Sequence, residues 1–108
     1  MTAETKAALV WCPFCDAESA RTIAGTLLEE KLIACANIMP AIESVFEWQG
    51  KVSSESESAA LFKTTAEHLD ALTRRLEELH PYETPAIVGW LVDKTPPRTM
   101  EWLNETLK

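Results

Sequence analysis

Residues 42–53 read IESVFEWQGKVS, which is two runs of strand-forming residues on either side of Gln49-Gly50. A glycine at the second position of a two-residue loop tolerates a positive φ, so this stretch predicts a tight β-hairpin. With Gln49-Gly50 as the loop, Trp48 lies opposite Lys51. We take this hairpin as the feature around which the rest of the chain is organised.

The arms of the hairpin extend over Ala34–Thr65. An arm of about ten residues spans roughly 33 Å, whereas a domain of this length is only about 26 Å across, so the tip should project beyond its own core. Both faces carry apolar side chains: Ile42, Phe46 and Leu61 on one, and Val45, Ala60 and Phe62 on the other. One face can cover the chain's own helices, and the other needs a partner. We therefore expect a homo-oligomer built on the hairpin, and the alternative is a ribbon folded back on its own domain.

The composition fits a single domain over residues 1–108, with 17 acidic against 10 basic residues and a net charge of −7. Without a basic stripe or a run of lysines and arginines, nucleic acids and anionic membranes are poor partners. The early apolar run Ala7–Trp11 is too short for a signal-peptide core or a membrane span. We therefore expect a cytoplasmic protein whose cysteines, Cys12, Cys15 and Cys35, are reduced thiols.

Two strand–helix units flank the hairpin. Ala7–Cys12 predicts a central strand that ends at the segment Cys12–Cys15, and Asp16 can cap the helix that follows. Its apolar stripe consists of Ala20, Ile23, Ala24, Leu27 and Leu28. Pro40, inside the first hairpin arm, indicates an edge strand with a bulge.

After the hairpin, Thr64 and Glu67 have the spacing of a capping box for a second helix. That helix has a leucine stripe and ends before His80-Pro81. Pro85–Val92 predicts the last strand, and Pro96-Pro97 opens a short C-terminal helix. The order β-α-β-β-α-β predicts an α+β, ferredoxin-like sandwich: a four-stranded antiparallel sheet, with both long helices on one face, a long central hairpin and an extra C-terminal helix. The bare sheet face is a second argument for an oligomer.

Cys12 and Cys15 are separated by two residues between a strand and a helix. A helix N-terminus can lower the pKa of a thiol, and a thiolate can attack disulfides or bind soft metals. The alternative is two thiols at a strand end with no functional partner.

An imidazole, a phenol and a carboxylate lie within His80–Glu83, between two prolines that stiffen the loop. This loop enters the last strand, whose start should lie beside the end of the first strand. His80 could therefore meet Cys12. The alternative is that His80 only interacts with the end of its helix.

Four segments together resemble the CutA family of divalent-cation tolerance proteins. They are residues 32–40 (LIACANIMP), 47–51 (EWQGK), 61–65 (LFKTT) and 80–85 (HPYETP), and the likeness extends from about Ala7 to Leu107. The resemblance implies a ferredoxin-like fold, a homotrimer with interlocking hairpins, and binding of copper(II) and other divalent metals. It brings no established enzymatic activity, so we expect a protein of metal tolerance that is not an enzyme.

The resemblance also implies site residues. The metal-binding cysteine falls on Cys12 and a metal-binding histidine on His80. A second histidine of some members is replaced here by Leu79, so the full ligand set is absent, and Cys15 or Glu83 would have to complete it. The recurring pocket residues of the family match Trp48, Lys63, Tyr82 and Glu83, which we expect at a cleft between subunits.

Two other functions remain open. The arrangement of Cys12 and Cys15, with Thr84-Pro85 before a strand, resembles glutaredoxin, which would make the protein a thiol-disulfide oxidoreductase. That likeness covers only two short stretches. Alternatively, the chain is a PII-like trimeric signalling protein that binds a small ligand at its intersubunit cleft, although it has no glycine-rich phosphate loop.

Overall fold

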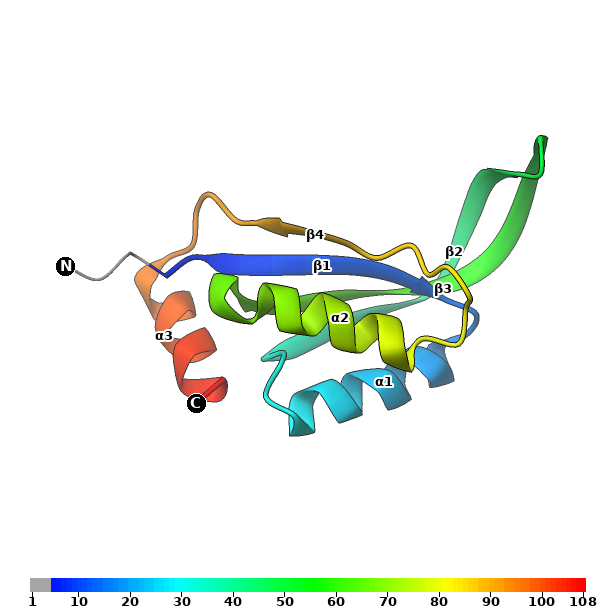
Figure 1. The fold of residues 1–108 in the computed structure, drawn as a ribbon. Helices are drawn as coiled ribbons and strands as arrows, with labels where there is room; N and C mark the ends of the chain where they lie inside the picture. The colour runs from blue at the N-terminus through cyan, green and yellow to red at the C-terminus, as the bar shows by residue number, and fades with distance from the viewer. Residues whose placement is uncertain (1–4) are drawn as a thin grey trace.

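Residues 5–108, which this computed structural model describes, form four strands: β1 (Ala7–Phe14), β2 (Cys35–Trp48), β3 (Lys51–Thr65) and β4 (Val88–Leu91). The strands make one antiparallel sheet in the order β2-β3-β1-β4 (Figure 1). Because β4 runs antiparallel beside β1, the loop that enters β4 lies next to the end of β1. The predicted α+β, ferredoxin-like sandwich is confirmed.

The same residues form three α-helices: α1 (Ala17–Glu29), α2 (Leu69–Leu79) and α3 (Pro97–Thr106). Asp16 caps α1, because its Oδ1 accepts the backbone N–H of Ser19 at 2.8 Å. Most of the predicted stripe of α1 is buried, but Leu28 is exposed. A short 3₁₀ turn, Ala66–His68, leads into α2.

The main core lies between the sheet and the two long helices. It consists of alternate residues of β1 and β3 with the apolar faces of α1 and α2: Val10, Cys12, Phe14, Ala60, Phe62, Ile23, Leu27, Leu72 and Leu76. Side chains alternate along a strand, so this face of the sheet belongs to the helices. The prediction that one hairpin face covers the chain's own helices is confirmed at the base of the hairpin.

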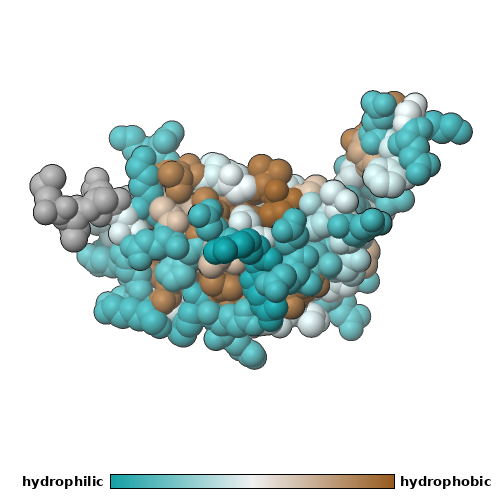
Figure 2. Space-filling view, in the orientation of Figure 1, coloured by the Kyte–Doolittle hydropathy of each residue, from teal (hydrophilic) through white to brown (hydrophobic). Residues whose placement is uncertain are grey.

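Among residues 5–108, no long helix packs against the opposite face of the sheet. By alternation from the buried set, it presents Leu9 and Trp11 of β1, Leu61 of β3 and Trp90 of β4. We call this surface the helix-free face. Helix α3 covers only one end of the sheet, where Leu103 and Leu107 pack against Ala7 and Ala34. Figure 2 shows hydrophobic residues gathered along the side of the body where β4 lies.

The hairpin projects from the body, which gives the chain extents of 51 × 25 × 22 Å (Figure 1). Trp48 pairs with Lys51, as predicted. Gln49 and Gly50 both have positive φ, 51° and 78°, as a primed turn requires. The register shifts between Met39 and Ile42, so the bulge predicted around Pro40 is confirmed.

One predicted boundary in β1 is wrong. The strand does not stop at Cys12 but continues through Pro13 to Phe14. Strand β4 pairs only as far as Trp11, so Pro13 lies beyond its end. The carbonyl of Pro13 points to the β4 side of β1, and the N–H of any other residue at this position would point the same way. Because β4 does not extend this far, the proline removes no hydrogen bond of the sheet.

Two predictions around α2 are also wrong. Thr64 does not cap a helix: it is inside β3, and its hydroxyl donates to the carbonyl of Leu32 at 2.8 Å. The last strand starts at Val88 rather than at Pro85, because the N–H of Ile87 bonds locally to the carbonyl of Pro85 at 3.1 Å instead of joining the ladder.

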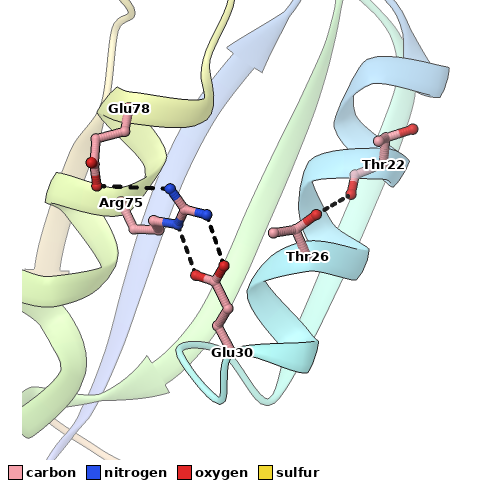
Figure 3. Close-up of polar contacts among 5 residues, drawn as sticks. All are labelled: Thr22, Thr26, Glu30, Arg75 and Glu78. Atoms are coloured by element: carbon pink, nitrogen blue, oxygen red, sulfur yellow. Dashed lines mark hydrogen bonds and ion pairs between the residues drawn. The ribbon is translucent and has the colours of Figure 1, made fainter.

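An ion pair joins the two long helices (Figure 3). Arg75 of α2 donates from Nε and Nη2 to both carboxylate oxygens of Glu30, at 2.8 Å each, and its Nη1 lies 4.0 Å from Glu78. In α1, the hydroxyl of Thr26 donates to the carbonyl of Thr22. The bidentate geometry fixes the C-terminal end of α1 against α2.

Within the described residues, the structure contains no helix with the length and apolar character that crossing a membrane requires.

Candidate functional site

His80 ends α2 and turns its ring back toward β1, where it is buried with 6% of its surface exposed. Its Nδ1 lies 3.1 Å from the backbone nitrogen of Tyr82, which can only donate. Nδ1 is therefore the acceptor, and the proton sits on Nε2, which donates to the carbonyl of Pro13 at 2.8 Å. The ring also stacks on Phe14, with centroids 4.6 Å apart. Both ring nitrogens of His80 are thus used inside the chain.

Cys12 points into the core and is fully buried. Burial, together with the nearby charge of Glu57, raises the pKa of its thiol to about 12. This is opposite to the lowered pKa considered from the sequence. The reason is local: β1 continues past Cys12, so the side chain alternates inward, and α1 begins only at Ala17.

Cys12 and His80 converge on one atom, the carbonyl oxygen of Pro13. The Cys12 sulfur lies 3.5 Å from this oxygen and His80 Nε2 lies 2.8 Å from it. A metal ion would need a thiolate and a free imidazole nitrogen. Here the thiol is protonated and both imidazole nitrogens are hydrogen-bonded. As arranged in this chain, the two residues do not fit a resident metal ion.

Cys15, one of the two further ligands considered, is exposed, and its sulfur lies 3.6 Å from the hydroxyl of Ser19. All three cysteines are free thiols. Among the described residues, no group of three histidine, cysteine or acidic side chains is placed to hold a metal. The proposed redox pair would need Cys12 as the attacking thiolate, and its raised pKa opposes that role.

Tyr82 connects the loop between α2 and β4 to the hairpin. Its hydroxyl donates to Oε2 of Glu57 at 2.8 Å, and its ring lies 4.6 Å from that of His80. Burial and the hydrogen bond to Glu57 raise the pKa of the phenol well above its ordinary value. The phenol is therefore a neutral donor that holds one carboxylate in place.

A cavity of about 590 Å³ lies between the hairpin and this loop. We call it the hairpin cavity. The hairpin contributes Phe46, Trp48, Glu55 and Glu57 to its wall, and the loop contributes Tyr82 and Glu83. The lining thus combines aromatic surface with carboxylates, and a cavity of this size can hold a small organic molecule.

Three of the four residues expected at a cleft, Trp48, Tyr82 and Glu83, line the hairpin cavity. Lys63 does not. It lies farther along β3, on the helix-free face, and lines a smaller cavity of about 200 Å³ next to α3. Within one chain these two places are separate.

The sequence reasoning did not single out Glu57 or Pro13. For Glu57 a signal existed: the hairpin register places it opposite Ile42, on the same side as Phe46 and Trp48. For Pro13 none existed, because it acts through its backbone carbonyl, which every residue possesses.

The fold and cavity define a class: α+β ferredoxin-like proteins with a long projecting hairpin. A family model described as CutA1 divalent ion tolerance protein matches residues 8–106. The chain belongs to this family.

Several curated relatives of this chain are named as CutA proteins. The chain is 42% identical over 88 residues to the divalent-cation tolerance protein CutA of Thermus thermophilus, covering 82% of this chain and 85% of the relative. It is 39% identical over 100 residues to that of Pyrococcus horikoshii, covering 93% and 97%. The chloroplastic CutA of Arabidopsis thaliana is 36% identical over 91 residues, which are 84% of this chain but only 50% of that protein.

Solved structures show the same fold. The divalent ion tolerance protein CutA1 of Ehrlichia chaffeensis superposes with a TM-score of 0.92 at 32% identity, over 98% of this chain and 99% of the other. CutA1 of Pyrococcus horikoshii gives a TM-score of 0.87 at 38% identity, over 94% and 98%. Where these names state a role, it is tolerance of divalent ions.

Proposed function

We propose that this protein acts in divalent-cation tolerance as a homotrimer assembled through its β2–β3 hairpins and helix-free face. The tolerance role is supported by the family to which the chain belongs and by the names of its relatives. The assembly is supported by the surface of the chain itself.

We infer the assembly from the apolar surface that one chain leaves exposed. Val45 and Val52 of the hairpin are 67% and 80% exposed, Trp48 is 63% exposed, and Val88 and Trp90 of β4 are 57% and 44% exposed. Large apolar side chains exposed on both faces of the hairpin and on β4 are what an interface between chains would cover. In the part of the chain that the structure describes, β2 and β4 are the two unpaired edges of the sheet, and such edges favour pairing with a further strand.

Light scattering on the purified protein tests the assembly. We expect a mass three times the 12.1 kDa of one chain. Val88→Lys should dissociate the trimer, because it would bury a charge in the interface. Leu28→Lys, a matched change on the exposed side of α1, should leave the mass unchanged. A wild-type monomer would contradict the proposal.

We further propose copper as the ion of this tolerance role, with Cys12, His80 and Cys15 as the residues involved. The support is chemical: thiol and imidazole groups suit copper, and the Cys12 sulfur and His80 lie around one carbonyl oxygen. Copper would bind there only after a rearrangement in which the Cys12 thiol loses its proton and His80 gives up a hydrogen bond, and so not as a resident ion of the group as it is arranged in this chain.

Calorimetric titration tests this proposal, with copper(II) in one arm and copper(I) under anaerobic conditions in the other, because thiols reduce copper(II). Cys12→Ser, Cys15→Ser and His80→Ala should each lower the affinity. Cys35→Ser is the matched control, because Cys35 lies in β2, away from this group. If all three variants bound copper with the affinity of the wild type, these residues would not be the copper ligands.

A further inference from the structure

The hairpin cavity is strongly acidic. Glu55, Glu57 and Glu83 all contribute to its wall, and no lysine, arginine or histidine within residues 5–108 does so. Among the described residues, none of these three carboxylates takes part in an ion pair. Strand alternation brings two basic residues of β3 to this side, Lys51 at the tip opposite Trp48 and Lys63 near the other end of the strand, and neither lines the cavity. The cavity therefore favours a cation and disfavours phosphate or other anions.

The aromatic side chains of the cavity indicate which kind of cation. Phe46 and Trp48 present ring surface from the hairpin, and Tyr82 does so from the facing loop. Aromatic faces attract organic cations such as ammonium and guanidinium groups, and they offer an apolar surface to the carbon chain attached to them. A bare metal ion has no carbon chain that could pack against that apolar surface.

The carboxylates also disfavour a metal. Oxygen-liganded metals need several donors converging on one point. No group of three acidic, histidine or cysteine side chains in the described part of the chain does this. The carboxylates instead lie around the wall, and one of them, Glu57, is held by the hydroxyl of Tyr82 at 2.8 Å. This arrangement suits a ligand with an extended body and a hydrogen-bonding cationic head.

We propose that the hairpin cavity binds an organic cation with a primary ammonium or guanidinium head, whose head contacts the carboxylates and whose carbon chain lies against Trp48 and Phe46. This chemistry has two sources: a free small molecule, or a lysine or arginine side chain of a second copy of this chain. The cavity adjoins Cys12 and His80 through Glu57 and Tyr82, but neither Cys12 nor His80 lines it, so binding of the cation requires no metal ion.

Calorimetry with cadaverine as the probe tests the free-ligand source. 1,5-Pentanediol and glutarate serve as neutral and anionic molecules of the same chain length. We expect saturable binding of cadaverine alone, weakened at least tenfold by Glu57→Gln and by Glu83→Gln. Glu47→Gln is the matched control: it removes the same charge from the same hairpin, but Glu47 lies between Phe46 and Trp48 in β2 and so faces away from the cavity.

Light scattering of the same variants tests the second source. If the cation belongs to a neighbouring copy, cadaverine will not bind, and Glu57→Gln with Glu83→Gln will dissociate the assembly while Glu47→Gln leaves it intact. Either of these two results supports the proposal. The proposal is overturned if neither cadaverine binding nor assembly distinguishes the cavity variants from Glu47→Gln, or if glutarate binds as well as cadaverine. Circular dichroism confirms that each variant is folded.

Discussion

The hydroxyl of Tyr82 donates to Oε2 of Glu57 at 2.8 Å, and the backbone N–H of the same tyrosine donates to His80. His80 in turn donates to the carbonyl of Pro13 at the end of β1. One loop residue thus links the hairpin to the central strand. The geometry of the hairpin cavity depends on this chain of bonds.

Replacing Tyr82 by phenylalanine should destabilise the protein by about 1–3 kcal/mol, the range for a lost hydrogen bond to a half-buried carboxylate. Urea unfolding measures this change. Combined with Glu57→Ala in a double-mutant cycle, the loss should be less than additive, because both substitutions remove the same bond. Strict additivity would show that the two side chains do not interact in solution.

His80→Ala should destabilise the protein by about 2–4 kcal/mol even in the presence of a metal chelator. The substitution leaves the N–H of Tyr82 and the carbonyl of Pro13 without partners and removes the ring stacked on Phe14. Chemical unfolding in EDTA is the measurement. Cys15→Ser, at an exposed site, should change stability by less than about 0.5 kcal/mol. If His80→Ala were as stable as the wild type in the presence of the chelator, these contacts of His80 would not stabilise the fold, and the histidine would have another role.

The fold could be predicted because its signals are local and agree with one another. The loop Gln49-Gly50 fixes the hairpin register, Pro40 marks the bulge, and Asp16 marks the start of α1. Two of the three errors have a common cause. The sequence around Pro13 predicts the end of a strand, and the threonine pair before α2 predicts a helix cap. Pairing between β1 and β3 overrides both of these local preferences.

The candidate site could be predicted only in part. Strand order brings the sulfur of Cys12 and the ring of His80 to the same carbonyl oxygen, which the β-α-β-β-α-β pattern already indicated. The pattern does not say that Cys12 points into the core or that His80 has no free nitrogen. Those properties depend on side-chain direction and on backbone partners, which residue types alone do not specify.

Stability should fall as the pH rises from about 9 toward 12, because of Cys12. Its pKa is near 9.0 for an accessible thiol and is raised to about 12 in the folded chain. Below pH 9 the thiol is protonated in both states. Above it, the unfolded chain releases a proton that the folded chain retains, and the free energy of unfolding falls by up to about 1.4 kcal/mol per pH unit.

Urea unfolding at pH 8, 8.5, 9 and 9.5 measures this slope while the phenol of Tyr82, whose ordinary pKa is 10.0, contributes little. Cys12→Ala should flatten it, whereas Cys15→Ala, at an exposed thiol, should not. An equal slope in Cys12→Ala and the wild type would mean that another group controls this pH range.

Gly50→Ala should weaken the hairpin turn by about 1 kcal/mol. Gly50 has a φ of +78°, which an L-residue adopts at a cost, and no neighbouring atom lies within 4 Å of an added Cβ, so the effect is one of backbone conformation alone. Gly25→Ala, in α1 and equally free of neighbours, should instead stabilise by about 0.5–1 kcal/mol through helix propensity. Amide hydrogen exchange measures both: protection should fall at Trp48 and Lys51 in the first variant and rise along α1 in the second. Changes of the same sign in the two variants would contradict the left-handed turn and, with it, the register that places Trp48 and Glu57 on one side of the hairpin.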